Sequence, residues 1–228
     1  MPAEAHAPAT LLGRYGRLPG EVERLSLARL EEQAGMVLPN EPGTHHLVRR
    51  VLYAAGDPGL APMVRVHPLA VPAGVAALSA GATVVVDVSM VAAGLHRDAL
   101  RRLGCSLVVA IDEPDAPRVA MEAGITRSAA AFRLLASRLG GAVVAIGNAP
   151  TALLELLDQV DAGAPPPAVI LGMPVGLVAA TESKAELAAR AIPYATVLGT
   201  RGGSPLAAAA VNSLVELAAH ERAGIDDG

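Results

Sequence analysis

The sequence predicts an α/β fold, namely a single doubly wound, mostly parallel sheet with flanking helices. The chain has 228 residues and 52% of them are apolar, which is enough to build one full core. Five short runs are continuously apolar and rich in Val and Ile, as strands buried on both faces are. They lie at residues 83–86, 106–111, 142–146, 168–171 and 194–198. Helical stretches separate these runs, which indicates crossover connections between parallel strands.

The N-terminal part of the chain predicts a flexible arm followed by a helix. Residues 1–20 are rich in Pro, Gly and Arg, and we expect them to form the arm. From residue 21 the apolar positions recur at helical spacing, which predicts a helix to about Ala34. The positions that carry this spacing are Val22, Leu25, Ala28 or Arg29, and Leu30.

A second helix is expected from Pro42 or Thr44 to Ala55, closed by Gly56 as a C-terminal cap. Residues 69–86 are uncharged and long enough to suggest a membrane span. Pro72 and several small or polar residues interrupt that stretch, so it predicts a helix, a turn and a buried strand.

The remaining helices are expected between and after the strands. They are predicted at residues 97–103, 115–123, 128–139, 149–160, 182–191 and 204–220. No change of composition divides the chain, so we expect one domain over residues 21–220 and a short tail over residues 221–228.

Composition disfavours several classes of protein. A net charge of −4, no basic run and very few aromatic residues are atypical of nucleic-acid binders. The single Cys105 cannot form an internal disulfide, and the N-terminus lacks a signal-peptide pattern, so the cytoplasm is favoured. The six histidines follow no metal-binding spacing, and no metal site is expected.

Candidate site residues follow the strands, because ligands of open parallel sheets bind at the carboxyl ends of the strands. Four junctions carry polar or glycine-rich segments: residues 87–90, 147–151, 172–184 and 199–204. The last has the glycines and helix N-terminus of an anion site, with Arg201 as a fork for carboxylate or phosphate. A simple tight turn explains the same residues equally well.

Single residues at these junctions have two interpretations. Asp87 is either a catalytic carboxylate or the cap of the helix that follows it. Asn148 and Pro150 suit a helix start, so capping alone explains them. Arg127, next to a capping Thr126, is either a ligand clamp or a surface arginine.

Taken together and in order, the junction segments resemble the precorrin-8X methylmutase family. The segments are residues 87–94, 126–131, 141–153, 172–176 with 182–184, and 202–204. The likeness extends from about Val22 to Leu214, and residues 147–153 are its highly specific part.

This resemblance implies an isomerase of cobalamin biosynthesis with a precorrin-8X methylmutase-like fold. Such enzymes move a methyl group from carbon 11 to carbon 12 of a tetrapyrrole, precorrin-8X or cobalt-precorrin-8, to give hydrogenobyrinate or its cobalt form. It further implies that no cofactor takes part, that the protein is a homodimer with the macrocycle near its interface, and that neighbouring corrin-pathway enzymes are candidate partners. The implied substrate-binding residues are Ser26, Arg49, Asp87, Arg127, Asn148, Thr151, Lys184, Arg201, Gly202, Gly203 and Ser204.

The chain departs from the family pattern at positions that carry chemistry. Tyr53 occupies the position of the family's catalytic histidine, and a tyrosine hydroxyl is a far weaker acid than an imidazolium. Thr200 occupies an arginine position, with Arg201 one place later, and Leu25 replaces the arginine before Ser26. Two hypotheses follow: a working methylmutase that uses Tyr53, or a non-catalytic or repurposed paralogue that binds a corrinoid intermediate or product.

Overall fold

A six-stranded sheet forms the centre of the computed structural model, which describes residues 10–11 and 18–226. The strand order is β1-β6-β5-β4-β2-β3. Every neighbouring pair is parallel except β1 and β6, which are antiparallel, so the predicted mostly parallel sheet is confirmed. The strands are β1 (Val64–Val66), β2 (Val84–Val86), β3 (Leu107–Val109), β4 (Val143–Ile146), β5 (Val169–Gly172) and β6 (Tyr194–Val197).

The inner strands separate two hydrophobic clusters, one on each face of the sheet. All residues of β2, β4, β5 and β6 are buried, as their continuously apolar sequences predict. Along β4 the side chains alternate between the clusters: Val143 and Ala145 join one, and Val144 and Ile146 join the other.

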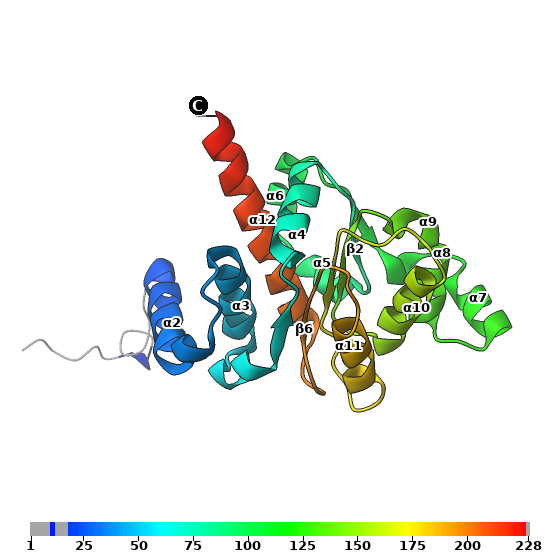
Figure 1. Cartoon of the computed structure of the whole chain (residues 1–228), viewed down its shortest axis with the longest axis horizontal. Helices are drawn as coiled ribbons and strands as arrows, with labels where there is room; N and C mark the ends of the chain where they lie inside the picture. Colours follow the sequence, from blue (N-terminus) through cyan, green and yellow to red (C-terminus); the bar gives the residue numbers. More distant parts are fainter. Residues whose placement is uncertain (1–9, 12–17, 227–228) are drawn as a thin grey trace, which may run out of the picture.

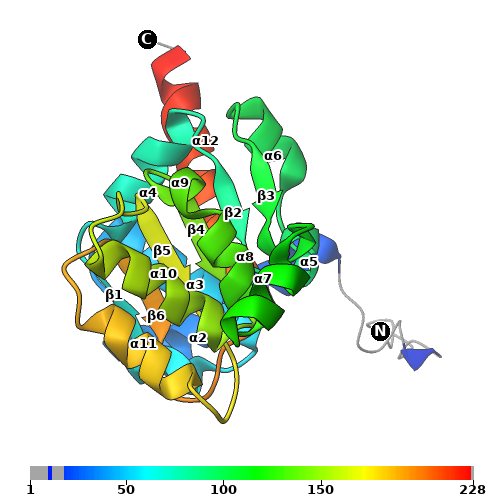
Figure 2. The same ribbon diagram turned by 90° about the vertical axis from the view of Figure 1, so that its right-hand side faces the viewer.

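Helices cover both faces of the sheet (Figure 1). The first face carries α3 (Pro42–Ala55), α4 (Ala70–Ser79), α5 (Ser89–Ala93), α6 (Arg97–Arg102) and α12 (Ser204–Asp226), and α2 (Pro19–Ala34) packs on the outer side of α3. The second carries α7 (Ala116–Ala123), α8 (Arg127–Leu134), α9 (Ala136–Leu139), α10 (Pro150–Asp161) and α11 (Ala180–Ala188), and Figure 2 views the molecule from that side. Three short 3₁₀ helices, η1 (Gly35–Val37), η2 (Pro58–Met63) and η3 (Ala110–Asp112), complete the connections.

Local capping fixes both ends of α3. The Glu41 carboxylate accepts hydrogen bonds from the backbone N–H groups of Gly43 and Thr44, so the helix begins at Pro42. Gly56 adopts a left-handed conformation with φ of 62°, which confirms the predicted C-terminal cap.

Some elements differ from the sequence prediction. Strand β1 was not expected, because the charged Arg65 interrupts its short apolar run. The helix expected over residues 128–139 breaks at Leu135 into α8 and α9. Helix α12 does not end near His220 but runs to Asp226, through most of the expected tail. The predicted arm lies largely outside the described residues, and α2 begins at Pro19.

Within the described part of the chain, no helix is both long and apolar enough to cross a bilayer. The stretch over residues 69–86 instead forms α4, a turn and β2, as predicted.

Candidate functional site

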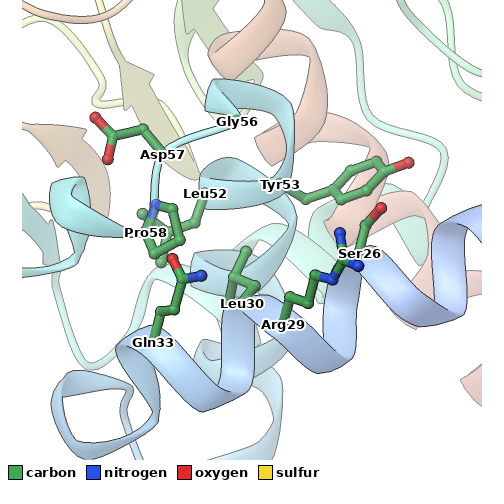
Figure 3. Close-up of a pocket in the computed structure, with 9 residues that line it drawn as sticks. All are labelled: Ser26, Arg29, Leu30, Gln33, Leu52, Tyr53, Gly56, Asp57 and Pro58. Atoms are coloured by element: carbon green, nitrogen blue, oxygen red, sulfur yellow. The ribbon is translucent and has the colours of Figure 1, made fainter.

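A cavity of about 280 Å³ lies between α2 and α3, and it brings together two of the predicted site residues, Ser26 and Tyr53 (Figure 3). Leu30 of α2 and Leu52 of α3 supply its apolar surface, and both side chains are buried. Tyr53 follows Leu52 on α3 and is 36% exposed, so its ring stands at the mouth of the cavity. The other lining residues are Arg29, Gln33, Gly56, Asp57 and Pro58.

Arg50 packs against the Tyr53 ring. Its guanidinium carbon lies 5.7 Å from the ring centre, within the range of a cation–π contact. Glu23 of α2 accepts a 2.6 Å hydrogen bond from this guanidinium, and Glu216 of α12 accepts a second at 3.4 Å. Arg50 of α3 is therefore held against Tyr53 by hydrogen bonds to α2 and α12.

Glu216 extends this contact into a network behind the cavity. Its carboxylate also lies 3.0 Å from His46 Nε2 and 3.8 Å from His96 Nδ1. The hydrogen bond with His46 is the largest of the effects that hold the pKa of Glu216 below its usual value. The contact between His46 and Glu216 joins α3 to α12. His46 does not line the cavity.

The loop between β6 and α12 reaches the cavity through one ion pair. Arg201 in this loop pairs with Asp57, which lines the cavity. The same pairing is the largest cause that lowers the pKa of Asp57. Arg201 therefore lies beside the Tyr53 cavity, and its guanidinium is engaged by Asp57.

Lys184 binds the backbone of the loop between β6 and α12. Its side chain is fully buried, and Nζ donates a 2.6 Å hydrogen bond to the backbone oxygen of Arg201. Burial lowers the pKa of this amine to about 8. Lys184 thus positions the Arg201 loop and presents no amine to the cavity.

Glycines allow the loops after β4, β5 and β6 to pack backbone against backbone. Gly203 N–H donates to the Met173 oxygen at 2.8 Å, and a Cβ at Gly202 would lie only 2.4 Å from that same oxygen. A Cβ at Gly147 would lie 2.7 Å from Ser204 Cα. The predicted positions Gly202, Gly203 and Ser204 are consecutive, and they lie where the loops after β4, β5 and β6 pack together.

Asp87 organises the loop after β4. It is 1% exposed, and its carboxylate oxygens accept N–H groups from Gly147, Asn148 and Ala149 at 3.0, 2.8 and 2.9 Å. Burial raises its pKa, and these hydrogen bonds oppose that rise. The interpretation of Asp87 as the cap of the next helix is wrong, because it binds the start of α10 and α5 follows it without a side-chain cap.

Asn148 does not cap α10. Ala149 occupies the N-cap position, and Asp87 binds the adjacent N–H groups instead. The Asn148 side chain is exposed at the carboxyl edge of the sheet.

The other predicted residues lie outside this cavity. Thr126 caps α8 as expected, and its hydroxyl lies 2.7 Å from that of Thr151 at the start of α10. The exposed Arg127 donates to the Ile111 oxygen at 2.6 Å. Arg49 faces Glu31 at 3.6 Å on the side of α2.

Sequence reasoning missed three polar cavity residues, Arg29, Gln33 and Asp57. Arg29 follows Ser26 by three positions on one helix, so the two side chains share a face, and this spacing was a usable signal. Asp57 offered no signal, because its partner Arg201 is 144 positions away. Over residues 10–11 and 18–226, no cluster of His, Cys, Asp and Glu side chains suits a metal ion.

The chain is similar to known precorrin-8X and cobalt-precorrin-8 methylmutases. The family model described as CbiC, precorrin-8X methylmutase, matches residues 21–217. A precorrin-8X methylmutase of Pseudomonas aeruginosa is 47% identical over 85% of this chain and 93% of its own length. A cobalt-precorrin-8 methylmutase of Priestia megaterium is 36% identical over 88% of each chain. The crystal structure of precorrin-8X methylmutase from Thermus thermophilus superposes with a TM-score of 0.79 and 36% identity over 88% of this chain and 98% of that one.

Proposed function

The chain belongs to the precorrin-8X methylmutase family, isomerases of cobalamin biosynthesis, and we propose that it catalyses the methyl shift from carbon 11 to carbon 12 of the tetrapyrrole. The observation that carries the proposal is the family match over residues 21–217, which includes the cavity where Ser26 and Tyr53 meet. We propose precorrin-8X, the metal-free form, as the substrate. The higher identity to the Pseudomonas relative than to the Priestia relative supports that choice.

The reaction is an isomerisation, so its atoms balance within the substrate. The bond between the methyl group and carbon 11 breaks, the bond to carbon 12 forms, and the product is hydrogenobyrinate. The protein has to hold the macrocycle in one tautomer and to offer a proton donor near a ring nitrogen. We assign the donor role to the Tyr53 hydroxyl, since that ring stands at the cavity mouth with Arg50 behind it.

The proposal includes a homodimer with the macrocycle near its interface. Arg127, Asn148 and Thr151 lie outside the cavity of their own chain. In such a dimer, these residues of one copy would lie within reach of a macrocycle bound in the cavity of the second copy. Arg201 and Lys184 then serve the cavity by fixing the loop after β6.

Turnover of precorrin-8X tests the function directly. We expect the protein to convert precorrin-8X to hydrogenobyrinate, followed by the change in absorption. Tyr53→Phe removes the hydroxyl and should lower kcat about tenfold or more. Tyr194→Phe is the matched control, because the Tyr194 hydroxyl is bound to the Ala188 oxygen inside the fold, and it should leave kcat near the wild-type value.

The paralogue hypothesis makes a different prediction in the same assay. A repurposed binder would hold hydrogenobyrinate tightly without turning over precorrin-8X, and Tyr53→His would restore turnover. That combination would reject the enzyme proposal. Failure of the protein to bind any tetrapyrrole would reject both hypotheses.

A further inference from the structure

The cavity between α2 and α3 contains a cation, Arg29, that no acidic side chain of the described residues neutralises. Two charged residues line it, Arg29 and Asp57, and Asp57 is already paired with Arg201. The Arg29 side chain is exposed and forms no ion pair or hydrogen bond with any residue that the structure describes. The lining therefore retains one positive charge.

Three polar side chains of the cavity lie toward one end. Arg29 and Ser26 project from the same face of α2, and Tyr53 projects from α3 toward them, while Asp57 and Pro58 lie toward the other end (Figure 3). The Ser26 hydroxyl donates to the Val22 oxygen, so its lone pairs rather than its proton face outward. The five N–H donors of the guanidinium dominate this end and suit an acceptor-only group.

The size of the cavity indicates what part of a ligand enters it. A volume of about 280 Å³ is smaller than the roughly 300–1,000 Å³ of pockets that enclose a whole drug-sized ligand. A tetrapyrrole macrocycle does not fit inside, but one of its acetate or propionate arms does. The macrocycle would then rest at the mouth, beside the exposed Tyr53 ring.

We propose that Arg29 binds a peripheral carboxylate of the tetrapyrrole and thereby anchors the macrocycle over Tyr53. The inference rests on the proposed function for the identity of the ligand. The planar guanidinium matches a carboxylate with two parallel N–H···O bonds, which a lysine cannot reproduce. The Leu30 and Leu52 side chains pack against the hydrocarbon part of the arm.

Titration with hydrogenobyrinate, followed by absorption, tests the contact without requiring turnover. Arg29→Ala should weaken binding about tenfold, as expected for loss of a hydrogen-bonded charge pair, and Arg29→Lys should recover part of that loss. Arg24→Ala is the matched control, since Arg24 is an exposed arginine of the same helix outside the cavity, and it should change the affinity less than about twofold. Raising the salt from about 50 to 300 mM should weaken wild-type binding more than binding by the Arg29→Ala variant.

The outcomes separate this inference from the proposed function. Equal effects of Arg29→Ala and Arg24→Ala, or an unchanged salt dependence in the Arg29→Ala variant, would overturn the carboxylate contact. A wild-type protein that binds hydrogenobyrinate through Arg29 but converts no precorrin-8X would overturn the proposed activity and leave the contact standing. Absence of any binding by the wild type would overturn both.

Discussion

Two buried side chains form hydrogen bonds with backbone atoms that are distant in the sequence. The carboxylate of Asp87 accepts the N–H groups of residues 60 to 62 positions later, and Lys184 binds an oxygen 17 positions later. Both side chains are buried, so leaving either without its backbone partners would cost free energy. The geometry of the loops at the carboxyl edge therefore depends on a few polar atoms.

Replacement of Asp87 by Asn should destabilise the protein strongly. The amide offers one acceptor oxygen where the carboxylate offers two, and its NH₂ group would face backbone donors. We expect the free energy of unfolding to fall by about 2 kcal/mol in urea titrations at neutral pH. The control is Asp98→Asn on the surface of α6, where an exposed pair with Arg101 is lost and the change should stay below about 1 kcal/mol. Equal losses in both variants would contradict the role given to Asp87.

Among the elements, the loops after β5 and β6 depend on close backbone contact. Gly202→Ala would place a methyl group against the Met173 and Pro174 oxygens, which are backbone atoms and cannot rotate away. We expect a loss of about 1–3 kcal/mol in stability and weaker hydrogenobyrinate binding, because Arg201 is the neighbouring residue.

Gly20→Ala, in the first turn of α2, serves as the control for this loop. A Cβ at Gly20 has no atom within 4 Å, so thermal melting and affinity should stay near the wild-type values. If Gly202→Ala has the same melting temperature and hydrogenobyrinate affinity as Gly20→Ala, the loops after β5 and β6 do not depend on close backbone contact.

Elements that are continuously apolar were predictable, and contacts between distant segments were not. The runs that became β2, β4, β5 and β6 were recognisable, because strands buried on both faces are mostly apolar; the buried Thr196 of β6 is the exception. Strand β1 is an edge strand with the exposed Arg65, so it lacks that pattern. The sequence also indicated Tyr53 and Ser26 as site residues, whereas the pairing of Asp57 with Arg201 arises only when the chain folds.

At the scale of the whole molecule, Lys184 should make the stability depend on pH. Burial lowers its pKa from 10.5 to about 8 in the folded state, so the unfolded chain binds more protons between these two values. Stability should therefore rise with pH across this window, and the benefit should be lost as the pH falls through about 8.

Urea unfolding from about pH 7 to pH 10.5 measures this contribution as a difference between the wild type and Lys184→Met. Other titrating groups affect both proteins alike, so the difference isolates the amine. We expect the stability of the wild type relative to Lys184→Met to increase across the window. Parallel pH profiles would contradict the lowered pKa.

The long helix α12 joins the two ends of the described chain. It packs on α3 and α4, and its Glu216 meets Arg50 and His46 across 166 and 170 positions of sequence. Proteins made on the ribosome usually begin folding from the N-terminus. Here α2 and α3 precede α12 in the chain, and Glu216 of α12 supports the Arg50 that packs behind Tyr53. The network behind Tyr53 can therefore be completed only after α12 has been synthesised.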